Sequence, residues 1–273
     1  MNKPFGNFYN NKRVFITGHT GFKGSWLSLW LLSLGADVTG YSAYIPSSPS
    51  NFEVCRLDQR LNHIVGDVRD ENHLFTAISD NEPAILFHLA AQPIVRASFD
   101  DPKRTFDTNV GGTVNILEGI RQNKSIKQAV IITSDKCYKN LEWTWGYREN
   151  DILGGEDPYS ASKACAEIVC HSYIKSFFSG VSNTKIATAR AGNVIGGGDW
   201  AKHRIIPDCV RSWSQDQAVV IRHPEATRPW QHVLEPLSGY LLLPWALSKN
   251  PGLQGEAFNF GPDTKINHTV REL

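Results

Sequence analysis

The stretch Val14-Phe15-Ile16-Thr17-Gly18-His19-Thr20-Gly21-Phe22-Lys23-Gly24 joins a predicted strand to a predicted helix through a glycine-rich turn. Val14 to Ile16 are apolar, which indicates the end of a buried strand, and residues 25–32 continue as an amphipathic helix that ends near Gly35. The free N–H groups and the dipole at such a helix start attract anions, and glycines let a phosphate approach the backbone. The stretch therefore predicts a site for the pyrophosphate of a dinucleotide.

Strands and helices alternate over the first 190 residues. Apolar and β-branched runs predict further strands at 36–41, 62–68, 84–90, 128–133 and 185–190, and helices at 71–79, 105–121 and 158–178. The run 84–90 is almost continuously apolar, which is typical of a parallel strand covered on both faces. This order predicts an α/β fold with a doubly wound parallel sheet, the Rossmann arrangement, with ligands beyond the carboxyl ends of the strands.

The composition changes near residue 191 to pieces rich in glycine, proline and tryptophan. We expect residues 1–191 to form the dinucleotide-binding domain and residues 192–273 to form a smaller α/β region that binds the substrate. Within that region, the segment 231–248 contains a predicted helix at 239–247 that we expect to pack back on the first domain. The chain stops at Leu273 inside a predicted helix, so we expect a truncated C-terminal region.

The composition argues against several classes of function. A net charge of +1 and 20% charged residues give no electrostatic reason to bind nucleic acid or an anionic membrane. The N-terminus lacks the apolar run of a signal peptide, and the apolar stretches 26–34 and 240–247 are too short to span a bilayer. The five cysteines are scattered and the histidines lack ligand spacing, so we predict no metal site and a reducing, cytoplasmic location.

A second motif begins at the predicted helix 158–178. Asp157 can cap this helix, Pro158 suits its first turn, and Tyr159 and Lys163 lie four residues apart on one face. A phenol has a pKa near 10, so a tyrosine base at pH 7 needs a shift of about 3 units, or about 4 kcal/mol. An ammonium at about 4 Å supplies about that much at an effective dielectric constant near 20. Alone, the pair would be an ordinary surface pair; beside the glycine turn, it indicates catalysis.

Several motifs occur together in this chain. They are 17–24 (TGHTGFKG), 88–92 (HLAAQ), 133–138 (TSDKCY), 159–163 (YSASK) and 190–200 (RAGNVIGGGDW). In combination they resemble the nucleotide-sugar dehydratase branch of the extended short-chain dehydrogenase/reductase family. The resemblance implies NAD as the cofactor and CDP-glucose as the substrate. It implies a lyase reaction in which the sugar is oxidised at C4, loses water across C5 and C6, and receives the hydride back at C6.

The same resemblance implies roles for the catalytic residues. Tyr159 would take the proton of the C4 hydroxyl, and Lys163 would hold the nicotinamide ribose and depress the pKa of Tyr159. Ser134 would hydrogen-bond the C4 oxygen, and Asp135 would protonate the departing C6 hydroxyl. Lys136 replaces the glutamate that serves as the C5 base in dTDP-glucose dehydratases. It is either a base, with its pKa lowered by burial or by the Lys163 charge, or a cation that stabilises the C5 enolate.

The cofactor site is predicted from the ends of the strands. Its residues are Gly18, His19, Gly21, Phe22, Lys23, Gly24, Ser42, Asp67, Val68, Leu89, Ala90, Ala91, Gln92 and Asn109, with Tyr159 and Lys163. Asn109 is expected to kink its helix and hold a water, as in the family. No acidic residue lies near Ser42 to hold the adenosine ribose. The basic His19 and Lys23 are either solvent-facing or able to accept a 2′-phosphate, so we expect NAD with a weak or mixed preference.

The substrate site is predicted within the second region. Its candidates are Asn193, Arg204, Pro207, Arg222, Arg228 and Trp230. The arginines suit a pyrophosphate, because a guanidinium matches phosphate oxygens. Asn193 could donate to the same phosphates, and Pro207 and Trp230 could shape the pocket for the base. The preference for cytosine is implied by the resemblance alone.

Two other functions fit parts of this pattern. A nucleotide-sugar 4-epimerase or reductase would need Tyr159 and Lys163 but no acid/base pair such as Asp135 and Lys136. A non-catalytic dinucleotide-binding protein would need none of them. By analogy with the family, helices 105–121 and 158–178 would form a four-helix bundle in a homodimer or homotetramer. The family also implies a place in dideoxysugar biosynthesis for the O-antigen of bacterial lipopolysaccharide.

Overall fold

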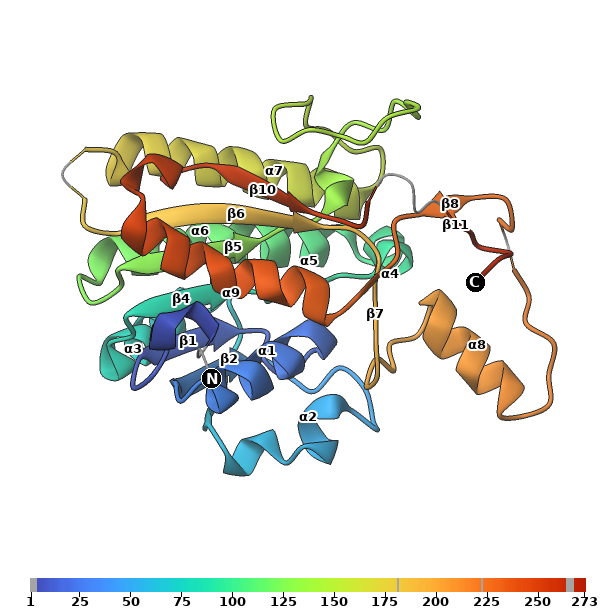
Figure 1. Ribbon diagram of the computed structural model, residues 1–273, viewed down its shortest axis with the longest axis horizontal. Helices are drawn as coiled ribbons and strands as arrows, with labels where there is room; N and C mark the ends of the chain where they lie inside the picture. The colour runs from blue at the N-terminus through green and yellow to red at the C-terminus, as the bar shows by residue number, and fades with distance from the viewer. Residues whose placement is uncertain (1–3, 181, 222, 264–267) are drawn as a thin grey trace.

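The computed structural model describes residues 4–180, 182–221, 223–263 and 268–273, and its main feature is a seven-stranded parallel sheet (Figure 1). The strand order is β10-β6-β5-β4-β1-β2-β3. The strands are β1 (Arg13–Thr17), β2 (Asp37–Ser42), β3 (Asn62–Val65), β4 (Ile85–His88), β5 (Gln128–Ile132), β6 (Lys185–Ala191) and β10 (Ala257–Phe260). The predicted doubly wound sheet is therefore confirmed.

Helices cover both faces of this sheet. The α-helices of the described residues are α1 (Phe22–Ser33), α2 (Asn51–Val54), α3 (Glu71–Asn81), α4 (Val95–Asp100), α5 (Pro102–Phe106), α6 (Gly112–Gln122), α7 (Pro158–Tyr173), α8 (Ile205–Trp213) and α9 (Leu234–Lys249). Helices α1 and α9 pack on one face, where Val14 and Ile16 of β1 point. Helices α3, α6 and α7 pack on the other face, together with Phe15. Because side chains alternate along a strand, two apolar faces require the continuous apolar runs seen in the sequence.

The register of the strands brings their carboxyl ends to one edge. Thr17, at the end of β1, pairs with Tyr41 of β2 and with His88 of β4. The residues that follow these strands, beginning with Gly18 and Leu89, therefore emerge side by side. This edge is where a doubly wound sheet binds its ligands.

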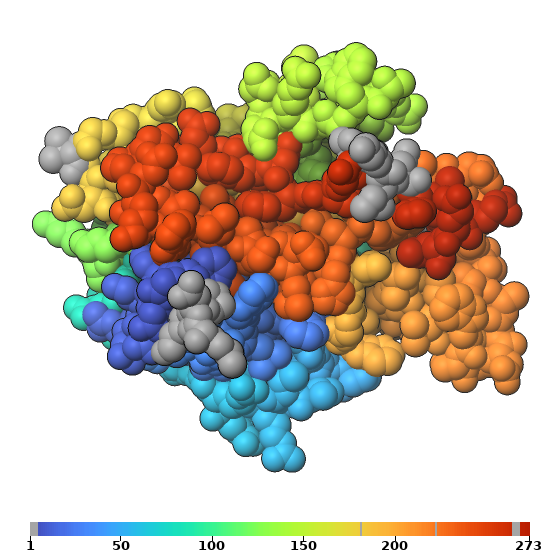
Figure 2. All heavy atoms as spheres, viewed as in Figure 1, coloured from blue at the N-terminus to red at the C-terminus, as the bar shows by residue number. Residues whose placement is uncertain are grey.

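The region after residue 191 returns to the main sheet. Helix α9 packs on β5 and β6 and buries Leu237, Tyr240 and Leu241 in the core, and β10 pairs with β6 as an edge strand. In Figure 2, α9 and β10 form much of the visible face. The rest of the region holds α8 and two small sheets, which pair β7 (Val194–Ile195) with β9 (Gln231–His232) and β8 (Thr227–Arg228) with β11 (His268–Thr269).

Several elements differ from the sequence expectations. Helix α1 begins at Phe22 rather than at residue 25, and the expected helix 105–121 contains a π-helical turn, Asp107–Gly111, between α5 and α6. The expected helix 158–178 is α7 followed by a second π-helical turn, Ile174–Phe178. Helices α2, α4 and α8 and strand β10 were not predicted. Within the part of the chain that the structure describes, no helix has the length and apolar character needed to cross a membrane.

Candidate active site

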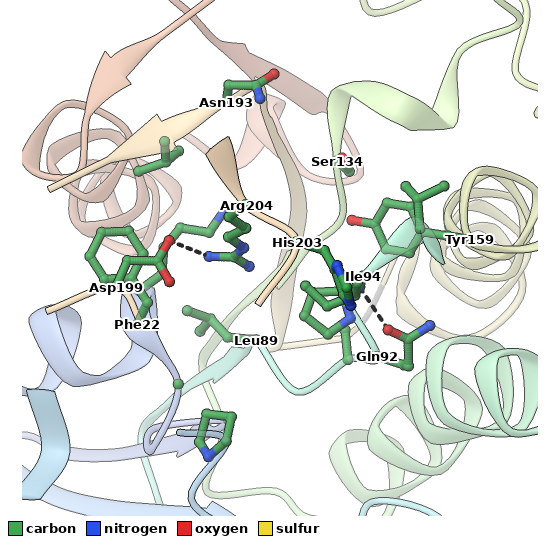
Figure 3. A pocket seen from close by; sticks show the side chains of 18 of the residues that line it. Phe22, Leu89, Gln92, Ile94, Ser134, Tyr159, Asn193, Asp199, His203 and Arg204 are labelled. Carbon is green, nitrogen blue, oxygen red and sulfur yellow. Dashed lines mark hydrogen bonds and ion pairs between the residues drawn. The ribbon is translucent and has the colours of Figure 1, made fainter. Parts of the chain in front are cut away.

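A cavity of about 900 Å³ opens at the carboxyl edge of the sheet. Its walls come from the segments that follow β1 to β6 and from the region around α8, and Tyr159 points into it from α7 (Figure 3). Most of the predicted site residues line it. They are Gly18, Gly21, Phe22, Lys23, Gly24, Ser42, Asp67, Val68, Leu89, Ala90, Ala91, Gln92, Ser134, Asp135, Lys136, Tyr159, Lys163, Asn193, Arg204, Pro207, Arg228 and Trp230.

Two of the predicted residues that the structure describes do not line the cavity. The side chain of His19 is fully buried beneath the glycine turn, and Asn109 is buried behind the loop that contains Gln92. Arg222 lies outside the described residues. The cavity therefore brings together the predicted glycine loop and the predicted catalytic residues.

The glycine turn is built by close backbone approaches. Gly18 has a φ of +76°, and a Cβ there would lie 2.7 Å from the backbone nitrogen of Ala90. A Cβ on Gly24 would lie 2.1 Å from the carbonyl oxygen of Gly18, so α1 could not start this close to the turn with any larger residue. The turn thereby places Gly18, Gly21 and the N-terminus of α1 together in the wall of the cavity. That arrangement fits the pyrophosphate of a dinucleotide.

His19 is not a cation at this site. Its Nε2 lies 2.7 Å from Nδ1 of His63, and its Nδ1 lies 3.0 Å from the hydroxyl oxygen of Ser42. Burial, with a further contribution from His63, lowers the pKa of His19 to about 3. The interpretation of His19 as a basic, solvent-facing side chain that accepts a 2′-phosphate is therefore wrong. It is a neutral ring that ties the glycine turn to the end of β2.

Lys23 faces the catalytic part of the cavity. Its Nζ donates to the hydroxyl of Tyr240 on α9 at 3.3 Å and lies 5.6 Å from the centre of that ring. Burial, together with the charges of Arg204 and Lys163, lowers the pKa of Lys23 to about 8, while Asp135 acts in the opposite direction. Because these partners surround the catalytic segment, the interpretation of Lys23 as solvent-facing or as a binder of an adenosine 2′-phosphate is wrong.

The adenosine end of the cavity offers a hydroxyl and a paired carboxylate. Ser42 ends β2 and is followed in the lining by Ala43 and Tyr44, so no acidic side chain occupies the position at the end of that strand. Asp67 is held by Arg69, whose NH2 lies 2.6 Å from its Oδ2. That hydrogen bond lowers the pKa of Asp67, which keeps the carboxylate ionised.

Asn109 lies within the π-helical turn, so the predicted helix irregularity is confirmed. Its Oδ1 accepts from the backbone N–H of Gln92 at 2.8 Å, and its Nδ2 donates to the backbone oxygen of Gln92 and to the hydroxyl of Ser162. Asn109 thus fixes the Gln92 loop to α7 from behind. It acts on the cavity wall without forming part of it.

The catalytic segment follows β5 as a short 3₁₀ turn, Asp135–Cys137. Ser134 caps this turn: its hydroxyl accepts from the backbone N–H of Lys136 and donates to Oδ1 of Asp135 at 2.9 Å. Asp135 is half-buried, whereas Lys136 is exposed at the mouth of the cavity. Because the side chain of Lys136 is exposed, burial does not support a role for it as a base.

Tyr159 is positioned by its helix start. Asp157 caps α7 by accepting from the backbone N–H of Ser160 at 2.9 Å, and Ser98 on α4 accepts from the backbone N–H of Tyr159. Burial raises the pKa of the Tyr159 phenol to about 12, although its hydrogen bond with Ser134 acts to lower it. The predicted depression of this pKa by Lys163 is therefore wrong for the protein without ligands.

Lys163 lies below Tyr159 on the same helix face. Its Nζ is directed to the backbone oxygen of Ile132, at 3.5 Å. Burial lowers the pKa of Lys163 to about 8, and the main opposing influence is the carboxylate of Glu167, one helical turn further on. The ammonium is thus held at the end of β5, beside the catalytic segment, and its charge depends on a buried acid that the sequence analysis did not identify.

The substrate end of the cavity carries an ion pair. Arg204 precedes α8, and its NH1 lies 2.8 Å from Oδ2 of Asp199, whose side chain is nearly buried (Figure 3). Arg228 lies on the small strand β8, and Asn193 is paired through its backbone with Gln231. Asp199 was missed as a site residue, although it belongs to the 190–200 motif. Among the described residues, no group of histidine, cysteine and acidic side chains could hold a metal ion.

The sheet order, the glycine loop and the Tyr159–Lys163 pair define a dinucleotide-binding protein of the short-chain dehydrogenase/reductase type. The chain belongs to the GDP-mannose 4,6 dehydratase family, whose sequence model matches residues 15–244.

Individual relatives agree with this membership. The chain is 53% identical to a CDP-glucose 4,6-dehydratase of Salmonella typhimurium over 97% of its own length and 75% of that protein. It is 27% identical to a CDP-paratose 2-epimerase of Salmonella typhi, over 96% of this chain and 82% of the relative. Among solved structures, a dTDP-glucose 4,6-dehydratase of Streptomyces venezuelae with NAD bound superposes with a TM-score of 0.82 at 22% identity, over 95% of this chain and 78% of that one.

Proposed function

We propose that this protein is a CDP-glucose 4,6-dehydratase, a hydro-lyase that uses NAD to convert CDP-glucose into CDP-4-keto-6-deoxyglucose. One observation carries the proposal: Ser134, Asp135, Lys136, Tyr159 and Lys163 line a single cavity with the glycine loop. They do so in a chain that is 53% identical to the Salmonella enzyme of that name. An oxidation centre and an elimination centre thereby face the same space.

The residues present fit a dinucleotide. The glycine turn and the N-terminus of α1 would hold its pyrophosphate, and Lys163 would hold the ribose next to the reacting ring. When bound, NAD supplies a hydride acceptor at C4 of the sugar and a hydride donor at C6. Because Ser42 offers only a hydroxyl at the end of β2, the chain would discriminate weakly against a 2′-phosphate.

The protein supplies the proton transfers. Tyr159 takes the C4 hydroxyl proton, and with a pKa of about 12 its phenolate costs about 7 kcal/mol at pH 7. The cationic nicotinamide and the Arg204 charge, which lowers this pKa, would reduce that cost. Asp135, held by Ser134, gives a proton to the departing C6 hydroxyl. In the elimination a water molecule accepts the proton that leaves C5, and the cationic side chain of Lys136 stabilises the negative charge that develops on the C4 oxygen.

The sugar nucleotide would lie across the second region. Arg204, Arg228 and Asn193 line the part of the cavity suited to its phosphates, and Pro207 and Trp230 line the part suited to its base. Arg204 is neutralised by Asp199 in the present structure, so phosphate binding would compete with that ion pair. By analogy with the family, we further propose a cytoplasmic enzyme that forms a homodimer or homotetramer.

A direct assay tests the proposed function. Protein, NAD and CDP-glucose are mixed, and the alkali-induced absorbance of a 4-keto-6-deoxy sugar is measured. We expect this chromophore to form in proportion to enzyme and time. A nucleotide-sugar 4-epimerase would change the sugar without producing the chromophore, and a binding protein without activity would leave the sugar unchanged. Either result would overturn the proposal.

A further inference from the structure

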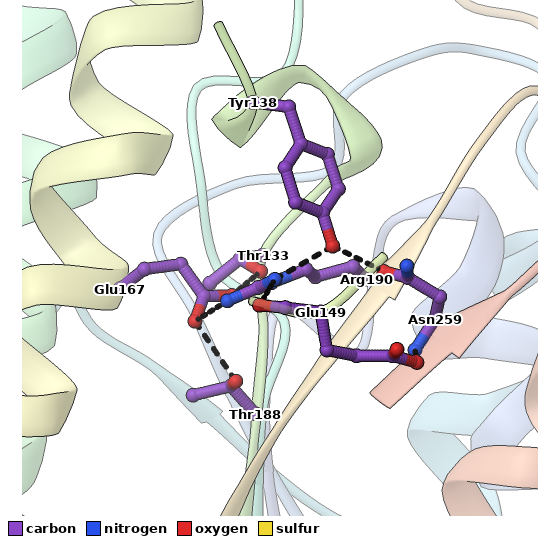
Figure 4. A network of polar contacts seen from close by, with 7 residues as sticks. All are labelled: Thr133, Tyr138, Glu149, Glu167, Thr188, Arg190 and Asn259. Atoms are coloured by element: carbon purple, nitrogen blue, oxygen red, sulfur yellow. Dashed lines mark hydrogen bonds and ion pairs between the residues drawn. The ribbon is translucent and has the colours of Figure 1, made fainter. Parts of the chain in front are cut away.

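A buried polar network lies directly behind the catalytic segment (Figure 4). At its centre, Glu167 of α7 and Arg190 of β6 form an ion pair with both side chains about 4% exposed. The Arg190 Nε and NH2 atoms each donate to the carboxylate at 2.9 Å. The hydroxyls of Thr133 and Thr188 also donate to it, one to each oxygen. The carboxylate is therefore saturated with donors, as a charge buried in a protein core must be.

The other side of Arg190 continues the network. Its NH1 donates to the hydroxyl of Tyr138 at 2.6 Å and to the backbone oxygen of Glu149. The Tyr138 hydroxyl in turn donates to Oδ1 of Asn259 on β10 at 2.7 Å. The guanidinium also lies 5.0 Å from the centre of the Tyr138 ring. Arg190 thus joins α7, β6 and β10 to the end of the catalytic turn.

Two members of the network, Thr133 and Tyr138, lie on either side of the catalytic segment in the sequence. Thr133 immediately precedes the segment Ser134-Asp135-Lys136, and Tyr138 immediately follows the 3₁₀ turn Asp135–Cys137. Both hydroxyls bind the Glu167–Arg190 pair, Thr133 through Glu167 and Tyr138 through Arg190. The two ends of a short segment are therefore fixed to a single rigid ion pair. Neither Glu167 nor Arg190 lines the cavity, so neither can contact the substrate directly.

We propose that Glu167 and Arg190 are positioning residues that clamp both ends of the catalytic segment and so hold Asp135 and Lys136 in place for the elimination of water. The proposal rests on the proposed dehydratase function. An acid and a cation accelerate a reaction when they are held close to the atoms that react, and a small displacement of either group can lower the rate by a large factor. The hydride steps depend mainly on Tyr159 and Lys163, which lie on α7 outside the clamped segment, while Ser134 within the segment contacts the Tyr159 hydroxyl.

The hydroxyls of the network allow a matched test. Replacing Glu167 or Arg190 would leave an unpaired buried charge and endanger folding. Tyr138→Phe and Thr133→Val instead each remove one hydroxyl at an end of the segment. Thr188→Val removes a hydroxyl from the same carboxylate on β6, outside the cavity, and serves as the control. Tyr138 does not line the cavity either, so its loss cannot act through a lost substrate contact.

The measurements are product formation, solvent-hydrogen exchange at C5 of the sugar, the absorbance of the reduced nicotinamide in a single turnover, and the denaturant midpoint. We expect kcat to fall about tenfold or more in Tyr138→Phe and Thr133→Val, with KM nearly unchanged. In these two variants C5 exchange should slow and reduced nicotinamide should accumulate, because C4 oxidation outruns elimination. Thr188→Val should lower the denaturant midpoint by a similar amount and keep the wild-type kcat.

Three results would contradict the two proposals, and they can be told apart. A kcat that falls equally in Thr188→Val and in the two end variants would show a purely structural network and overturn the clamp. The clamp would also be overturned if both end variants turned over at the wild-type rate. If the wild-type protein forms no 4-keto-6-deoxy sugar, the proposed function itself fails, and the clamp fails with it.

Discussion

Replacing Gly24 with alanine tests the glycine turn at which the dinucleotide is proposed to bind. The added Cβ would lie 2.1 Å from the carbonyl oxygen of Gly18 and 2.7 Å from the Cα of His19, and both are backbone atoms. An ordinary contact needs more than 3 Å, so α1 must move by about 1 Å away from the turn. Overpacking of this kind costs about 1–3 kcal/mol of folding free energy. The displaced helix start should also weaken NAD binding by about tenfold or more, equivalent to about 1.4 kcal/mol.

The matched control for this change is Gly111→Ala. Gly111 lies in the π-helical turn with a helical backbone conformation, and a Cβ there would meet nothing within 4 Å. Its replacement should leave NAD affinity unchanged and raise stability slightly, by up to about 1 kcal/mol. Calorimetric titration of each variant with NAD and urea unfolding give both quantities. Wild-type NAD affinity in Gly24→Ala would refute the role of the glycine turn.

Three further predictions follow from the same site. Tyr159→Phe should lower kcat by about a thousandfold, because general-base catalysis is lost, while NAD affinity stays within about twofold of the wild type. Steady-state kinetics measure the first quantity and titration with NAD the second. Substantial residual turnover would contradict the role of Tyr159 as the base. Lys136→Met should abolish solvent-hydrogen exchange at C5 but spare C4 oxidation. NMR follows the exchange, and nicotinamide absorbance follows the oxidation. Loss of both would show that Lys136 does not act specifically in the elimination step. Burial lowers the pKa of His88 to about 3. The unfolded chain therefore binds this proton more tightly, so His88 contributes a loss of stability below about pH 6.5 that reaches about 2 kcal/mol at pH 5. His19, whose pKa is also lowered to about 3, contributes a similar loss. His88→Asn should remove about half of the combined loss from the urea-unfolding profile, and an unchanged profile would contradict the assignment.

The local parts of the fold were readable from the sequence. Val14 to Ile16 are apolar on both faces of a strand, and the glycines that follow indicate a turn before a helix, so β1, the loop and α1 could be predicted together. Strand β10 could not, because Ala257–Phe260 is short and half-buried and is defined by its pairing with β6, far away in the chain.

The errors at the site have a common physical cause. His19 was read as a loop cation, but its ring occupies space that Gly40 leaves free across the sheet; a Cβ on Gly40 would lie 2.2 Å from it. The pKa of Tyr159 was estimated from one neighbouring charge, whereas enclosure by distant segments dominates. Burial is one way in which Lys136 could act as a base, yet the side chain is exposed on the 3₁₀ turn. Solvation depends on non-local packing, which residue spacing does not encode.

The central claim is that one site both removes a hydride from C4 and returns it to C6 after water has left. Incubating the protein and NAD with CDP-glucose deuterated at C4, and recording the NMR spectrum of the product, follows that hydride directly. The account predicts a 4-keto sugar whose C6 methyl group carries the deuterium. Deuterium recovered at C4 of an epimerised or unchanged sugar would contradict it.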